Sequence, residues 1–153
     1  MNTQTSAKNL ANLYDQDFNL WIEATTQALH QGKFEQLDLE NLIEEIESLG
    51  RSDKRALRSQ LIRVIKHILK LKYQPNLHYS LNSWRSSVVE GRGQVKQLLK
   101  DSPSLNPYLA QVFEECYQDG KQEAVAETGL DRNLFPDTSE FSLEQILDPD
   151  FWP

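Results

Sequence analysis

The amino-acid sequence predicts an all-α fold, a bundle of four main helices with a short C-terminal helix and a docked aromatic tail. Apolar residues recur at helical spacing along most of the chain, and no segment alternates for long enough to form a strand. With 153 residues, the chain is about one domain long and needs no disulfides to hold a core. The predicted parts are a flexible N-terminus (residues 1–14), the bundle domain (15–136) and a C-terminal appendage of the same domain (137–153).

The first predicted helix covers residues 15–31. Its apolar face would carry Phe18, Trp21, Ile22, Thr25 and Leu29. Gly32 is a suitable stop, since glycine readily adopts the left-handed conformation that ends many helices.

A long second helix is predicted over residues 38–73, with Asp38 as its N-cap and Pro75 as the breaker beyond its end. Plotted at 100° per residue, one apolar stripe continues across Gly50. It contains Leu39, Leu42, Ile46, Leu49, Leu57, Leu61, Val64, Ile68 and Leu71. A loop would have no reason to preserve this phase, so we predict an uninterrupted helix in which Gly50 costs about 1 kcal/mol. The alternative is a break into two helices at the sequence LGRS.

Two further main helices and a short one complete the predicted bundle. The third covers residues 81–101 and carries Gly91 on its apolar stripe, where a missing side chain lets a neighbouring helix approach closely. The fourth begins with Asn106 as its cap and ends before Gly129.

The C-terminal segment carries a capping box and two large aromatic residues. Ser142 and Gln145 are spaced as a capping box for a short helix. Phe151 and Trp152 are costly to leave in water, so we expect the tail to dock on the bundle or on a partner.

Charge divides the chain into three parts. Residues 1–50 carry a net charge of −7, residues 51–100 carry +10, and residues 101–153 carry −10. Eight basic residues and one acidic residue lie within 51–72, in the second half of the long helix. The change of sign at Gly50 is the feature that a functional hypothesis has to explain.

The basic segment has two possible roles, which the sequence leaves open. Arg55, Arg63, Lys66 and Lys70 would point outward, and with Phe151 and Trp152 they form the candidate partner surface. Alternatively, the acidic fourth helix lies beside this segment and neutralises it, through exposed pairs worth about 0.2 to 1 kcal/mol each.

The sequence contains no recognisable catalytic, cofactor or metal motif. Cys116 is the only cysteine, so the chain has no internal disulfide and no cysteine pair for a metal, which favours a reducing cytoplasm. Glu44 and Glu47 lie one helical turn apart, but no histidine has the Glu-x-x-His spacing of a di-metal bundle. No apolar run is long enough to cross a membrane. We therefore predict no catalytic residue, no cofactor and no metal.

Several short strings resemble a known family. They are YDQDFNLW, LIEEIESLG, HILKLKYQP, SW, LLKDSPSL, ETGL and LFP, in this order, from about Tyr14 to Pro136. Together they resemble the bacterial family called domain of unknown function 29, which is common in cyanobacteria. The resemblance implies a compact all-helical cytoplasmic protein, and it implies no reaction, ligand or catalytic residue.

The sequence supports three functional hypotheses. The first is a non-enzymatic protein-protein interaction module that binds another protein or its own copy. The alternative is a nucleic-acid-binding protein that uses the basic residues within 51–72. The third, and weakest, is a metal protein or enzyme that uses carboxylates.

Overall fold

All regular elements in the described part of the chain are helical, which confirms the predicted all-α class. The computed structural model describes residues 3–74 and 78–153, with side chains over 9–74 and 80–153. The α-helices are α1 (Thr3–Gln16), α2 (Phe18–His30), α3 (Leu39–Tyr73), α4 (His78–Asp101), α5 (Asn106–Thr128) and α6 (Leu143–Leu147). Short 3-10 turns η1 (Phe34–Gln36), η2 (Pro103–Leu105) and η3 (Arg132–Leu134) lie between them.

Contacts divide the chain into two compact units, Met1–Ser52 and Asp53–Pro153. The sequence does not predict this division, and its own domain boundaries stay a prediction. Helix α1 lies where the sequence predicts a flexible N-terminus, in a polar stretch whose few apolar residues nonetheless recur at helical spacing.

Helix α3 passes through Gly50 without a break, as the phase of its apolar residues predicts. The alternative, two helices separated at LGRS, is wrong. The predicted stop at Pro75 lies outside the described residues.

In the first unit, a buried carboxylate and a tyrosine join three helices. Asp38, just before α3, accepts hydrogen bonds from Trp21 Nε1 at 3.3 Å and from Asn41 Nδ2 at 2.7 Å. The Tyr14 hydroxyl of α1 donates to Glu45 of α3. These contacts fix α1 and α2 against the beginning of α3.

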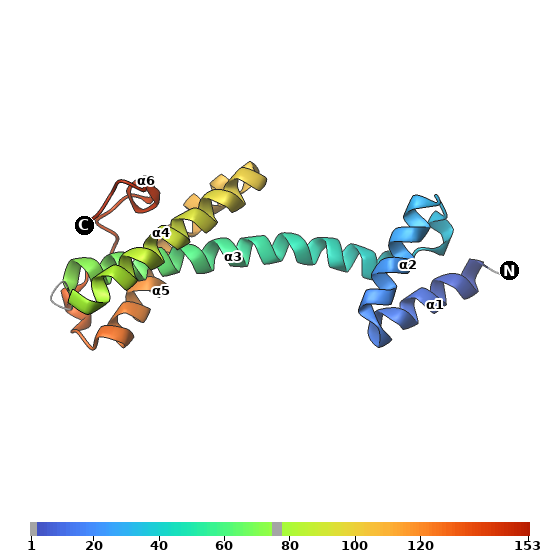
Figure 1. Ribbon diagram of the computed structural model, residues 1–153, viewed down its shortest axis with the longest axis horizontal. Coiled ribbons are helices and arrows are strands. Elements are labelled where there is room, and N and C mark those ends of the chain that lie inside the picture. The colour runs from blue at the N-terminus through green and yellow to red at the C-terminus, as the bar shows by residue number, and fades with distance from the viewer. Residues whose placement is uncertain (1–2, 75–77) are drawn as a thin grey trace. The chain divides into compact units, whose positions relative to one another are not determined.

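In the second unit, α4 and α5 pack on the later part of α3 around a core centred on that helix (Figure 1). Two glycines make the packing close. A Cβ atom added at Gly91 of α4 would lie 2.6 Å from Val64 Cγ2, and one added at Gly120 of α5 would lie 2.8 Å from Ile65 Cγ2. The predicted close approach at Gly91 is therefore confirmed, and Gly120 provides a second one.

The predicted helix stops and the capping box agree with the structure, but three predicted starts differ: that of the first helix, since α2 begins at Phe18 after its cap Asp17, and those of α4 and α5. Gly32 and Gly129 both have φ of +68°, the left-handed conformation expected of helix stops. The capping box of Ser142 and Gln145 is present. Asn106, however, is the first residue of α5, and the cap position is Leu105. The Asn106 side-chain amide donates to the carbonyl of Pro103. Helix α4 begins three residues before its predicted start.

The close approach at Gly91 makes a testable contrast within α4. Gly91→Ala should lower the free energy of unfolding by about 1 to 3 kcal/mol, because the new methyl group overlaps buried Val64. Gly93→Ala should raise it by about 0.5 to 1 kcal/mol, because nothing lies within 4 Å of its added Cβ. Urea unfolding followed by circular dichroism and tryptophan fluorescence measures both. Equal effects of the two substitutions would contradict the described packing.

Candidate functional site

The basic half of α3 lies beside the acidic helix α5, and their side chains form ion pairs. Arg58 donates to Glu115 at 2.7 Å and to Asp119 at 3.2 Å, one turn further along α5. The hydrogen bond from Arg58 lowers the pKa of Glu115. The neutralising arrangement that the sequence left open is therefore present here.

Two of the candidate partner residues converge on Glu127. Lys66 Nζ lies 2.8 Å from Glu127 Oε1 and 3.1 Å from Glu123, and Lys70 Nζ lies 2.7 Å from Glu127 Oε2. Burial raises the pKa of Glu127, but the hydrogen bonds and charges of Lys66 and Lys70 outweigh it and lower the pKa to about 2. Lys70 is itself buried, with its ammonium 4.6 Å from the centre of the Trp84 ring. The ammonium of Lys70 therefore contacts both the carboxylate of Glu127 and the ring of Trp84.

The other two basic candidates are separate from this cluster. Arg63 donates to Glu90 of α4 at 2.9 Å. Arg55 is exposed and has no ion pair among the described side chains. The structure thus brings Lys66 and Lys70 together and leaves Arg63 and Arg55 apart from them. Whether any of the four also binds a partner stays a prediction.

The aromatic tail docks on α4 of the second unit through Arg92. This buried guanidinium donates from Nε to the carbonyl of Ile146 at 2.7 Å and from Nη2 to the carbonyl of Phe151 at 2.9 Å. Its Cζ atom lies 5.1 Å from the centre of the Trp152 ring. The Phe151 ring contacts that of Phe141. The predicted docking of the tail is confirmed, and both candidate aromatic residues are half-buried there.

Sequence reasoning missed Arg92. It directly follows Gly91 on a helix that reads as a core helix, where it looks like one more member of the basic middle segment. Its hydrogen-bond acceptors are backbone carbonyls more than fifty residues away in the chain. Since backbone carbonyls carry no sequence signature, no local pattern could have marked this residue.

The first half of α3 exposes several apolar residues, three of which, Leu39, Ile46 and Leu49, the sequence assigns to the core stripe. Leu39, Ile43, Ile46 and Leu49 are each more than half exposed. Leu39, Ile43, Ile46 and Gly50 fall within about 60° of one another around the helix. Leu49 lies about 60° beyond Ile46, and we call these four residues together with Leu49 the α3 apolar face. The expectation that the whole stripe is buried is therefore wrong for this half, while Leu57, Leu61, Val64 and Ile68 of the same stripe are buried.

Acidic residues flank one edge of the α3 apolar face. Glu40, Glu44 and Glu47 succeed each other at spacings of four and three residues along this edge. Arg51 lies at its end, 2.6 Å from Glu44 and 3.6 Å from Glu47. With three carboxylates and one guanidinium, the edge is net negative.

The chain matches the family described as domain of unknown function DUF29 over residues 13–152. The protein belongs to this family. The match confirms the resemblance in the sequence and extends it beyond Pro136 into the docked tail. Comparisons with curated proteins and with solved structures gave no match.

In this DUF29 protein, His67 and Cys116 lie in largely buried surroundings. His67 Nδ1 lies 2.8 Å from the carbonyl of Arg63, and burial lowers the pKa of the imidazole. Burial raises the pKa of the Cys116 thiol to about 11, so it stays protonated at neutral pH. Within residues 9–74 and 80–153, no three His, Cys, Asp or Glu side chains gather as a metal site would require. None of the helices described is long and apolar enough to cross a membrane.

Because the pKa of Glu127 is lowered in the folded protein, the free energy of unfolding depends on pH. A carboxyl group with a folded pKa of about 2 stabilises the fold above its unfolded pKa of about 4.3, and this contribution is lost as pH falls from about 5 to 2. Because the Glu127 side chain is 43% exposed, solvent screening limits the effect to about 1 kcal/mol. Glu127→Gln should therefore destabilise the protein by about this amount at pH 7 and hardly at all at pH 2.

Urea titrations at several pH values measure this difference. Glu144→Gln is the control, since Glu144 is an exposed carboxylate without an ion pair among the described residues. It should change the free energy of unfolding by less than about 0.5 kcal/mol. A Glu127→Gln effect that stays constant down to pH 2 would contradict the assignment.

Arg92 should be required for tail docking. Arg92→Met removes two charged hydrogen bonds and leaves their carbonyl acceptors without these donors, so it should cost about 2 to 3 kcal/mol. It should also speed chymotrypsin cleavage at Phe151 and Trp152. Arg85→Met is the matched control, because Arg85 is exposed, lies 5.5 Å from the centre of the Trp152 ring and makes no hydrogen bond to the tail among the described residues. Equal cleavage rates for the two variants would show that Arg92 does not hold the tail.

Proposed function

We propose that this DUF29 protein is a non-enzymatic cytoplasmic interaction module that binds another protein through the α3 apolar face. The observation that carries this proposal is the exposure of four large aliphatic side chains on one short stretch of helix. Contiguous exposed apolar surface of this kind is typical of interaction sites. Cys116 is the only cysteine of the sequence, so the chain has no internal disulfide, which supports a reducing compartment.

The chemistry of the face favours a helical partner. Leu39, Ile43 and Ile46 have the spacing at which an amphipathic helix presents its anchors. The negative edge formed by Glu40, Glu44 and Glu47 favours basic residues flanking the partner's apolar side. We therefore propose a basic amphipathic helix of another protein as the occupant.

A second copy of the chain is a weaker candidate for this face. A two-fold interface brings the same patch of both copies together. Here that symmetry would set one net-negative edge against another, which opposes association. A helix of a different protein is therefore the better occupant.

Nucleic-acid binding through the basic half of α3 stays a prediction, and no observation favours it. Arg58, Arg63, Lys66 and Lys70 already lie in ion pairs with carboxylates of the same unit. Phosphate binding would have to compete with those carboxylates.

The double substitution Ile43→Ser with Ile46→Ser tests the proposal. Both side chains are exposed, so we expect a change in stability below about 1 kcal/mol and a loss of partner binding of at least tenfold. The probe is a synthetic amphipathic helix of leucine and lysine, compared with a matched helix of leucine and glutamate by calorimetry. The basic peptide should bind the wild-type protein more tightly than the acidic one.

Leu134→Ser is the matched control, since Leu134 is similarly exposed but lies in the second unit. It should leave binding of the basic peptide unchanged. Pull-down from native lysate with the same three proteins checks the result with a natural partner, and light scattering records self-association. Equal binding by the double variant and the wild type would refute the proposal, as would self-association that depends on Ile43 and Ile46.

A further inference from the structure

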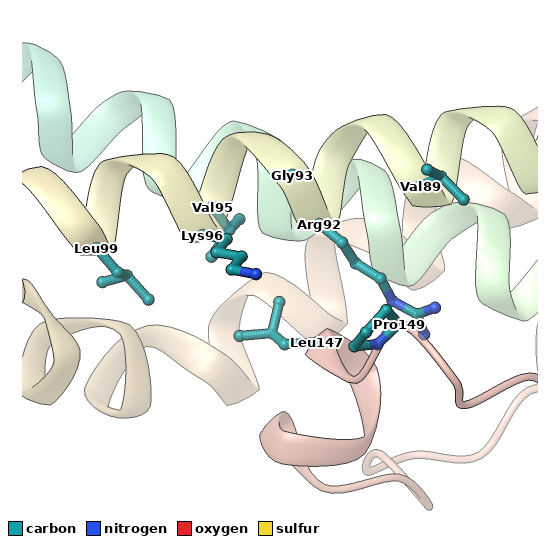
Figure 2. Close-up of a pocket in the computed structure, with 8 residues that line it drawn as sticks. All are labelled: Val89, Arg92, Gly93, Val95, Lys96, Leu99, Leu147 and Pro149. Carbon is teal, nitrogen blue, oxygen red and sulfur yellow. The ribbon is translucent and has the colours of Figure 1, made fainter.

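A cavity of about 440 Å³ lies between α4 and the C-terminal segment of the second unit (Figure 2). Its walls are largely apolar, with Val89, Val95 and Leu99 from α4 and Leu147 and Pro149 from the C-terminal segment. The volume is in the range of pockets that hold small organic molecules. This cavity is separate from the α3 apolar face, so a ligand site here is independent of the proposed function.

Two cationic side chains line the cavity, and no carboxylate is among its lining residues. Arg92 and Lys96 both project from α4 toward the C-terminal segment in Figure 2. Neither forms an ion pair with any side chain within the described ranges, although burial lowers the pKa of Arg92 and the nearby charge of Asp148 opposes this shift. The cavity therefore combines apolar walls with a lining whose charged residues are both positive.

Arg92 is an unusual cation because it is only 6% exposed and has no carboxylate partner among the described side chains. Its Nε and Nη2 atoms bind the two tail carbonyls, but the buried Nη1 atom has no hydrogen-bond partner among the described residues. Buried polar groups in proteins are almost always satisfied, and buried charges are usually paired. The Nη1 atom is itself too buried for a ligand to reach, so this guanidinium in the cavity wall favours an anionic ligand through its charge.

We propose that this cavity binds a small amphipathic organic carboxylate. The hydrocarbon part of the ligand lies between α4 and the C-terminal segment, against Val95, Leu99 and Leu147. The carboxylate lies at the cationic side, where Lys96 can bind it directly and Arg92 adds its positive field. The docked tail forms one wall of the site, so the tail has a role in addition to covering the core.

The arrangement distinguishes this ligand from others with a similar body. A neutral alcohol of the same chain length would gain the apolar contacts but leave both cations unmatched. An alkylammonium ion would be repelled by Arg92 and Lys96. A phospholipid membrane is a different partner, since it would require insertion of an exposed surface rather than occupancy of a cavity.

Titration of the full chain with decanoate, below its micelle concentration, tests the proposal by calorimetry and by ¹⁵N chemical shifts. We expect saturable binding at one site, with the largest shifts at α4 residues 93–99. Decyltrimethylammonium should not saturate the same residues. Lys96→Gln should weaken decanoate binding by about two- to fivefold, the range for an exposed charge pair.

Substitution of Gly93 tests most directly whether decanoate occupies the cavity. Gly93 lines the cavity, and nothing lies within 4 Å of a Cβ built there, so Gly93→Leu should fill the cavity without disturbing α4. We expect it to fold as judged by circular dichroism and to lose decanoate affinity at least tenfold. Gly93→Ala, which adds only a methyl group, should retain affinity within about twofold.

Three results would overturn the proposal. They are no saturable binding of decanoate by the wild-type chain, equal affinity in the folded Gly93→Leu variant, and equally tight binding of decyltrimethylammonium. Sedimentation with vesicles of anionic phospholipid separates the membrane alternative. Binding to vesicles without binding to dissolved decanoate would also refute the cavity site.

Discussion

The close packing of α3 against α4 and α5 is the constraint on which the second unit depends. Gly91 and Gly120 let the backbones approach until Val64 and Ile65 fill the space that side chains would take. At this distance, the basic side chains of α3 reach carboxylates on both neighbours. The change of charge sign at Gly50 therefore matches the later half of α3 to its own acidic partners within the fold.

The same helix performs a different task before Gly50. Its apolar residues there keep the helical phase of the buried stripe, yet they face solvent beside a row of carboxylates. One continuous helix thus supplies the centre of a core and, in the proposed function, a surface for another protein. The acidic edge of that surface and the basic residues of the later half account for the abrupt change of charge sign at Gly50.

Much of the fold can be predicted from local sequence signals. The phase of apolar residues across Gly50 predicts the unbroken α3, and Gly91 on an apolar stripe predicts a close helix contact. Gly32, Gly129 and the Ser142 capping box mark helix ends, since these depend on backbone conformation near the residue itself. The acidic fourth helix likewise indicates a neighbour for the basic segment. The sequence does not decide between this pairing and a partner surface.

The remaining features depend on contacts that the sequence does not encode locally. Periodicity shows which residues share a face but not whether anything covers it, so the sequence does not predict the exposure of Ile43 and Ile46. Helix α1 is polar overall and carries few apolar residues, and Asp38 accepts a hydrogen bond from the buried indole of Trp21 across seventeen positions. Arg92 binds backbone carbonyls, and its cavity exists only because the tail folds back on α4.

The central claim is that α3 is structural in its later half and available to a partner in its earlier half. Native-state hydrogen exchange measures this directly, because backbone amides in a core exchange only when the unit unfolds. We predict the slowest exchange at residues 57–69 and at least tenfold faster exchange at residues 43–49. Equal protection along the whole helix would contradict this division of roles.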